Sequence, residues 1–302
     1  VKTKMASAIR GGYVYGPTDE LVRVFSQMSA EESSEEAEVA KILQENLFNK
    51  LFEHAKKVVK EDDMLLKILI LASATSLTKS PTNVFVRGPP SIGKTHVTLN
   101  AAKYFSNTMI LMGMSPKAIV HEYSSYDKDE NAYIVDLWNK IIIFLEEPSS
   151  QVYEVLRPLM SHDKEEVEYR WVEQSKGKQR VMRSKIRGWP VFIFLGTTSK
   201  LLEDLVTRGI HTTPRMDAAK WTAVINFKGE SYSKPFNFIN STDHELKILQ
   251  KSIQRAQEYI KMRNIGCVIP YANIITNVVK QTIMSRMPRT ARDLEILFNL
   301  IG

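Results

Sequence analysis

The stretch Gly88-Pro-Pro-Ser-Ile-Gly93-Lys94-Thr95 decides how the rest of the chain is interpreted. It fits the pattern G-x-x-x-x-G-K-[ST], follows an apolar run at Asn83–Val86 and precedes a segment expected to be helical. Glycines in such a loop let backbone N–H groups turn toward an anion, and the start of a helix adds partial positive charge. The stretch therefore predicts a nucleotide-binding site, the alternative being a chance match in a surface loop.

The chemistry of nucleotide binding assigns roles within this loop. The Lys94 ammonium group is expected to reach the β- and γ-phosphates of ATP, and the Thr95 hydroxyl is expected to bind Mg²⁺. ATP and Mg²⁺ are thus the expected cofactors. The predicted nucleotide-binding residues are Gly88, Pro89, Pro90, Ser91, Ile92, Gly93, Lys94, Thr95 and His96.

A second candidate element is the apolar run Ile141–Leu145, which is followed by Glu146 and Glu147. Acidic residues at the carboxyl end of a buried parallel strand lie at the edge where open α/β sheets bind ligands. We expect Glu146 to hold Mg²⁺ through water, and Glu147 to orient and activate the attacking water. The alternative is that the two carboxylates are solvated and cap the next helix, ahead of Pro148.

Short apolar runs alternate with helical or mixed segments through the middle of the chain. The runs predicted as strands are Asn83–Val86, Thr108–Met112, Lys140–Leu145, Pro190–Leu195 and Thr222–Phe227. Strands that alternate with helices are typical of an α/β fold with a parallel sheet covered on both faces. The sequence therefore predicts a helical extension over residues 1–60, an α/β core with a five-stranded parallel sheet over residues 61–230, and a helical lid over residues 231–302.

An insert precedes the strand predicted at Pro190–Leu195. Polar and apolar residues alternate in strand rhythm from Glu166 to Trp171, a turn follows at Ser175–Lys178, and Gln179–Arg187 is expected to be the returning strand. This pattern predicts a β-hairpin over residues 164–188.

The tip of this hairpin is basic. Six bases and no acid lie between Lys176 and Arg187. Lysine and arginine contribute affinity for a phosphate backbone by releasing counterions, so we expect Lys176, Lys178 and Arg180 to bind DNA. The alternative is an ordinary solvated surface hairpin.

Composition narrows the class of protein. The 302 residues are 43% hydrophobic and 25% charged, which is typical of a soluble globular protein. The single cysteine, Cys267, excludes an internal disulfide framework and favours a reducing, cytoplasmic compartment. No apolar run reaches the ~18 residues of a membrane helix, so no membrane association is expected. The net charge of +7 is compatible with a polyanionic partner without identifying one.

The order of phosphate loop, acidic strand, hairpin and a later strand with a polar end resembles that of AAA+ ATPases. A hairpin just before that later strand is similar to the one in the branch that holds the minichromosome maintenance (MCM) helicases and the superfamily-three viral helicases. The segment Val191–Thr198 resembles the sensor-one strand, with Thr198 in place of the usual asparagine.

Two further segments carry arginines that the resemblance makes functional. Leu205–Arg208 resembles the segment that carries the arginine finger, for which Arg215 is a second candidate. Thr290–Leu297 is similar to the sensor-two helix of MCM proteins, which makes Arg292 the lid arginine.

The resemblance covers residues 36–302 and implies a motor that forms a ring, expected to be a hexamer, and moves on DNA in the replication of a virus or mobile element. Glu147 of one subunit would act with Arg208, and with Arg292, of its neighbour. Two other functions stay open. One is a remodelling or assembly ATPase that does not bind nucleic acid, and the other is a switch that binds ATP with little turnover.

Overall fold

The computed structural model describes residues 34–112, 124–175, 178–197, 205, 207–233, 238–263, 269–270, 272–281 and 290–301. These residues divide into two compact units. One unit is Ala55–Glu230, and the described helices before and after it form the other. Three residues singled out from the sequence, Lys176, Thr198 and Cys267, lie outside the described residues.

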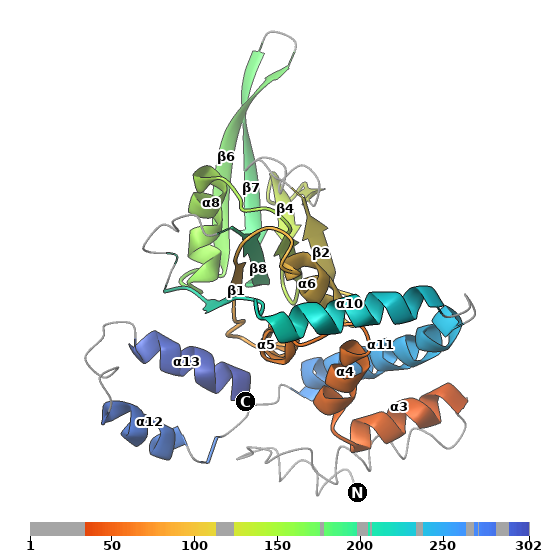
Figure 1. Ribbon diagram of the computed structural model, residues 1–302. Helices are drawn as coiled ribbons and strands as arrows, with labels where there is room; N and C mark the ends of the chain where they lie inside the picture. Colours follow the sequence, from red (N-terminus) through yellow and green to blue (C-terminus); the bar gives the residue numbers. More distant parts are fainter. Residues whose placement is uncertain are drawn as a thin grey trace, which may run out of the picture. The chain divides into compact units, whose positions relative to one another are not determined.

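Helices precede, connect and follow the strands (Figure 1). Their bounds are α3 Ser34–Gln44, α4 Leu47–Lys56, α5 Asp63–Ala74, α6 Lys94–Ala102, α8 Ser150–Met160, α10 Ala218–Ser233, α11 Phe238–Arg263, α12 Ala272–Lys280 and α13 Thr290–Ile301. Ion pairs join α3 to α11, from Lys251 to Glu35 and from Arg255 to Glu36. In the described part of the chain, no helix combines the length and the apolar character that a membrane crossing requires.

The first sheet contains five parallel strands in the order β2-β5-β8-β1-β9. Its strands are β1 Val84–Arg87, β2 Thr108–Leu111, β5 Ile141–Phe144, β8 Val191–Gly196 and β9 Ile210–Thr212. Four of them match the strands expected from the sequence to within one residue at each end. The rings of Phe85 and Phe144 each stack on Phe194, with centroids 5.1 Å apart, so the core of the sheet lies over its three central strands. The predicted α/β fold is confirmed.

The strand predicted at Thr222–Phe227 is wrong, because these residues lie inside α10. The fifth strand is β9, which pairs with β1 through Val84 and Ile210. A short apolar run does not distinguish a strand from a buried or surface helix by periodicity alone. The full length of α10, 16 residues, is what distinguishes it from a strand. Strand β9 has three residues, which are too few to show a pattern of their own.

Asn83 joins three strands at the amino edge of this sheet. Its buried side-chain amide donates to the carbonyl oxygens of Met160, at 3.3 Å, and Arg208, at 3.1 Å. Its Oδ1 accepts from the backbone N–H of Phe192 at 3.0 Å, and its carbonyl oxygen accepts from the N–H of Ile210 at 2.9 Å. One satisfied buried residue thus fixes β1, β8, β9 and the end of α8 relative to one another.

A second sheet has four strands in the order β3-β4-β7-β6. They are β3 Ser124–Asp127, β4 Ala132–Asp136, β6 Glu166–Ser175 and β7 Lys178–Arg187. The antiparallel pair β6–β7 is the predicted hairpin, whereas the pair β3–β4 was not predicted. Because β4 pairs in parallel with residues 184–187 of β7, the distal part of the hairpin is a two-stranded ribbon that extends past β4 (Figure 1).

Two short links connect the sheets to each other. Residues 137–140 lead from β4 into β5, and residues 188–190 lead from β7 into β8. The first link is paired with the end of β7, since the N–H of Leu137 donates to the carbonyl oxygen of Arg187 at 2.7 Å. Strand β5, which precedes Glu146 and Glu147, and strand β8 therefore each follow directly from a strand of the second sheet.

The links pack closely around one glycine. Gly188 has a φ of +92°, and a Cβ there would stand 2.5 Å from the backbone nitrogen of Trp138. The Trp138 and Trp189 rings meet edge to face, with centroids 5.5 Å apart. Both the positive φ and the lack of space require glycine at this point.

Candidate nucleotide-binding site

The loop between β1 and α6 has the backbone of an anion-binding loop. The residues Gly88, Ser91 and Gly93 have positive φ angles of 141°, 64° and 96°. Gly88 is buried, and a Cβ there would stand 2.4 Å from Cδ1 of Ile92, so this first glycine is required by both conformation and space. Alternating backbone conformations of this kind turn successive N–H groups toward one side, where an anion binds.

Lys94 lies folded over this loop. Its Nζ donates to the carbonyl oxygen of Gly88 at 2.7 Å and to that of Pro89 at 2.6 Å. Burial lowers the pKa of the Lys94 ammonium group. Because its present acceptors are neutral and hydrogen bonds to charged acceptors are roughly twice as strong, a phosphate would compete well for this ammonium group.

The first turn of α6 completes the anion site. The N–H groups that begin a helix have no partner within it, and here they follow the loop directly. Thr95 and His96 are exposed in this turn, and Nε2 of His96 lies 3.2 Å from the carbonyl oxygen of Val58. Backbone donors and the Lys94 charge thus converge on the place predicted for the nucleotide.

The donor set fits Mg²⁺ held jointly with a nucleotide. Across the described residues there is no group of three or more His, Cys, Asp or Glu side chains that could hold a metal alone. Mg²⁺ typically takes one or two protein ligands and completes its shell with phosphate oxygens and water. The Thr95 hydroxyl would be one such ligand, and Glu146, which is exposed after β5, would act through water.

The two acidic residues after β5 have different surroundings. Glu147, unlike Glu146, is partly buried and forms an ion pair with Arg87, with Oε1 2.9 Å from Nη2. Arg87 is the last residue of β1 and directly precedes Gly88. The structure therefore brings Glu147 beside the phosphate loop, where a base that activates water for attack on a phosphate would have to lie.

Strand β8 closes the other side of Glu147. Gly196, at the end of β8, stands opposite Arg87 in the strand register, and a Cβ on it would lie 2.9 Å from Oε2 of Glu147. The Tyr153 hydroxyl is buried, and no hydrogen-bond partner for it occurs within the described part of the chain. Burial, together with the charge of Glu147, raises the pKa of Tyr153. Glu147 thus lies among a cation, a glycine and a neutral phenol.

The predicted arginines lie in three different places. Arg208 precedes β9, at the edge of the sheet opposite the loop, and its Nη1 lies 3.5 Å from the carbonyl oxygen of Arg157. Arg215 follows β9 and forms an ion pair with Glu61 at 2.8 Å. Arg292 is exposed on α13, in the other compact unit. Within its own chain, Arg208 is therefore on the wrong side of the sheet to act on the nucleotide.

Three charged residues next to the loop were not predicted from the sequence. One is Arg87. Its place in the sequence, as a charged residue at the end of a buried strand, is a signal that could have identified it. The others are Lys220 and Asp62, whose Nζ and Oδ2 lie 2.6 Å apart, with Nζ also 2.7 Å from the carbonyl oxygen of Ile92. These two residues lie far apart along the chain and belong to no local pattern.

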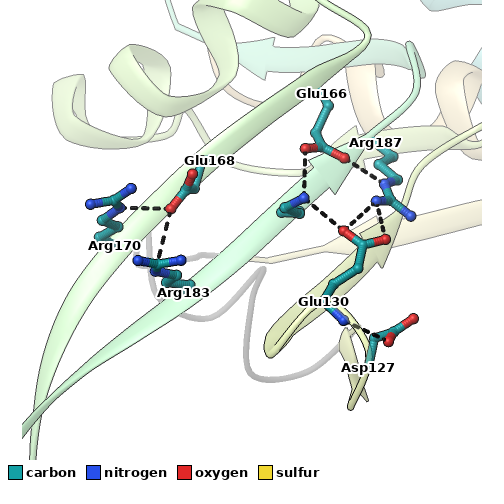
Figure 2. Close-up of polar contacts among 8 residues, drawn as sticks. Asp127, Glu130, Glu166, Glu168, Arg170, Arg183 and Arg187 are labelled. Carbon is teal, nitrogen blue, oxygen red and sulfur yellow. Dashed lines mark hydrogen bonds and ion pairs between the residues drawn. The ribbon is translucent and has the colours of Figure 1, made fainter.

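The base of the hairpin carries a connected set of ion pairs (Figure 2). Arg187 Nε lies 2.6 Å from Glu166 Oε2, and Lys185 Nζ lies 2.6 Å from Glu130 Oε2. Arg187 Nη2 also contacts Glu130, at 2.5 Å. Hydrogen bonds from Lys185 and Arg187 lower the pKa of Glu130, and the bond from Arg187 lowers that of Glu166. Acids on β6 and on the β3–β4 turn therefore neutralise the proximal bases of β7.

The basic residues of β7 lie at three levels along the strand, and the middle one, Arg183, has its Nε 3.8 Å from Glu168 Oε1. The proximal ones, Lys185 and Arg187, are paired as described. The distal ones, Lys178 and Arg180, lie in the two-stranded ribbon, where Arg180 stands opposite Glu173 in the strand register. The tip end of β7, residues 178–180, contains two bases and no acid in its sequence.

One comparison with known proteins agrees with this geometry at the level of the family. The family model of the MTBMA_p00010 P-loop domain matches residues 31–258. No curated protein is similar to the chain in sequence. Among solved structures, a protein of Cytophaga hutchinsonii described as a "putative ATPase" is 16% identical, with a TM-score of 0.38. The match covers 67% of this chain and 62% of that one, so this chain spans less than two thirds of that protein's length.

Replacing Gly196 by alanine tests the position of Glu147. The added Cβ would displace the Glu147 carboxylate, which is the flexible end of its side chain, so the fold should persist. We expect unchanged nucleotide affinity and turnover lower by about 100-fold, as for a misplacement of about 1 Å at a reacting group. Affinity is measured by calorimetry and turnover by phosphate release.

Gly229→Ala is the control, because its Cβ would meet no atom within 4 Å. Normal turnover by a folded Gly196→Ala variant would exclude Glu147 as the base.

Proposed function

The chain belongs to the MTBMA_p00010 P-loop domain family, and we propose that it is an ATPase that moves along DNA as a ring of identical subunits. Membership of a P-loop domain family, together with the loop at Gly88–Thr95, supports binding and hydrolysis of a nucleotide. Glu147 beside this loop supplies a base for the attacking water. The proposal also specifies the nucleotide as ATP with Mg²⁺, the track as DNA and the assembly as a ring.

One observation carries the DNA part of this proposal. Strand β7 begins at Lys178 in the basic distal ribbon, and its other end leads through residues 188–190 into β8. Gly196, at the end of β8, is close enough to Glu147 that a single added carbon would touch it. The continuous segment from β7 to β8 thus connects the ribbon to the surroundings of Glu147. A rearrangement around Glu147 during hydrolysis would be transmitted to the ribbon along this segment. Basic side chains there would bind the phosphate backbone.

The position of Arg208 supports a site shared between subunits. An arginine at the edge opposite the loop does not reach the nucleotide of its own chain, but a neighbour that docks on this edge would receive it. An arginine supplied across an interface stabilises the charge of the transferring phosphoryl group. A ring, proposed as a hexamer, satisfies this requirement for every subunit at once.

A second candidate function is remodelling of proteins. Val172 and Val181 face each other across the two strands of the ribbon, and 53% and 66% of their surfaces are exposed. An exposed apolar pair on a projecting ribbon suits contact with an unfolded polypeptide better than contact with DNA. Stimulation of the ATPase by an unfolded protein, without stimulation by DNA, would favour this candidate.

The rate of ATP hydrolysis with and without single-stranded DNA tests the proposal directly. We expect wild-type protein to release phosphate from ATP in the presence of Mg²⁺ and to do so faster with DNA. Lys94→Ala should bind no ATP and release no phosphate under either condition, because the phosphates lose their main cation. Normal hydrolysis by a folded Lys94→Ala variant would overturn the assignment of the loop. A wild-type rate that DNA leaves unchanged would remove the DNA part.

Replacing both Lys176 and Lys178 by alanine tests the hairpin. DNA affinity should fall for all sequences, and the slope of log affinity against log salt should decrease by about one unit for each lost phosphate contact. Hydrolysis without DNA should persist. Lys185→Ala is not a suitable control, because Lys185 is paired with Glu130; exposed Lys228→Ala on α10 is matched instead. An unchanged affinity and salt slope would make the hairpin an ordinary solvated surface.

Mixing two inactive variants tests the shared site. Arg208→Ala should bind ATP and hydrolyse it about 10³-fold more slowly, the usual effect of losing an arginine finger. Glu147→Gln should also bind ATP without hydrolysis, because the amide does not accept a proton. Co-assembled mixtures should regain activity wherever an intact Arg208 meets an intact Glu147. No recovery at any ratio would contradict the shared site. A harmless Arg208→Ala, with recovery from Arg215→Ala, would transfer the role to Arg215.

A further inference from the structure

Helix α10 is held in place by a lysine. All 16 residues of α10 are described, and Lys220 is the one that is buried. The apolar residues Trp221, Ile225 and Tyr232 are exposed. A surface helix ordinarily attaches through an apolar stripe on one face. In α10 the one buried side chain is instead charged and is inserted next to the phosphate loop, while Phe227 is half-buried, with Lys60 Nζ 4.7 Å from its ring centroid.

Lys220 is satisfied by two acceptors from different segments. Its Nζ lies 2.6 Å from Oδ2 of Asp62, and both side chains are at most 3% exposed. The same Nζ donates to the carbonyl oxygen of Ile92 at 2.7 Å. Asp62 is also fully engaged, since its Oδ1 accepts the backbone N–H of Arg215 at 2.8 Å. The buried pair therefore ties α10, the segment before α5 and the chain after β9 to the phosphate loop.

A buried ion pair is not an efficient way to stabilise a fold. The loss of hydration of both charges can exceed their attraction, and well-packed apolar residues of similar volume often serve as well or better. What apolar residues would not supply is a donor for the Ile92 carbonyl oxygen. The contact to the loop is therefore the part of this arrangement that only a hydrogen-bond donor provides.

The orientation of one peptide unit explains the value of this contact. The peptide between Ile92 and Gly93 is trans, so its C=O and N–H groups point in opposite directions. Gly93, with a φ of +96°, has no Cβ to favour one orientation of this unit over another. A hydrogen bond that fixes the carbonyl oxygen also fixes the N–H of Gly93, which then points away from Lys220.

We propose that Lys220 is a positioning residue of the nucleotide site, which orients the Gly93 N–H toward the phosphates by holding the Ile92 carbonyl oxygen from behind the loop. Lys220 itself does not touch the nucleotide, and Lys94 remains the cation on the phosphate side. Asp62 keeps Lys220 in place. The proposal rests on nucleotide binding by this loop and is independent of DNA, of the ring and of hydrolysis.

A double variant separates positioning from folding. Lys220→Met alone would leave the Asp62 carboxylate buried without its cation, so Lys220→Met is combined with Asp62→Leu to give an apolar pair. We expect this variant to remain folded, with an unfolding temperature lowered because the Arg215 N–H and the Ile92 carbonyl oxygen lose their partners. It should bind ADP about tenfold more weakly, as for one lost hydrogen bond to the ligand. Lys228→Met is the matched control, because Lys228 is an exposed lysine of the same helix. It should bind ADP as the wild type does.

The outcomes are distinct. A folded double variant with wild-type ADP affinity would overturn the proposal and leave Lys220 a structural residue. If the double variant does not fold, amide hydrogen exchange of Gly93 in the wild-type protein decides, since saturation with ADP should slow this exchange at least about tenfold when the N–H binds a phosphate. Unchanged exchange would overturn the proposal. A wild-type protein that binds no ADP would instead overturn the proposed function.

Discussion

The pairing of β8 between β1 and β5 is the constraint on which the candidate site depends. Phe194 of β8 stands beside Phe85 on one side and Phe144 on the other. Because the three strands are parallel, the segments that follow them leave the sheet at one edge. The phosphate loop follows β1, on one side of β8, and Glu147 follows β5, on the other side. Gly196, which ends the middle strand and has no Cβ, leaves room for Glu147 and Arg87 to meet across it.

The features that could be predicted from the sequence are those with a local pattern. The loop follows from the spacing of two glycines and a lysine, and the long hairpin follows from alternation in β6. Strand β9 was missed because three residues are too few to show a period, and its place was given to an apolar stretch of α10. The hairpin β3–β4 was missed because Ser124–Asp127 is polar, so only pairing with other strands defines it as a strand. The contacts of Lys220 depend on the tertiary fold and leave no trace in the neighbouring sequence.

The two sets of charges in this structure have different physical roles. The pairs at the base of the hairpin are accessible to solvent, so each contributes little to stability, and their main effect is to remove positive charge from the proximal part of β7. The pair of Lys220 and Asp62 is buried, so salt screens its charges much less and its geometry is tightly restricted. The first set distributes charge on a surface, whereas the second fixes the backbone of a loop.

The junction around Gly188 determines how the hairpin relates to the rest of the domain. The hairpin is not a simple insertion between two core elements, because β7 is the parallel partner of β4 and the link after β4 is paired with the end of β7. Excision of the hairpin would expose the edge of β4, and an exposed strand edge is a template for association with other chains. It would also remove the glycine against which Trp138 packs. A shortened protein of this kind is therefore expected to associate with itself. The hairpin and the β3–β4 pair therefore form one structural unit, which depends on the base of the hairpin and not on its tip.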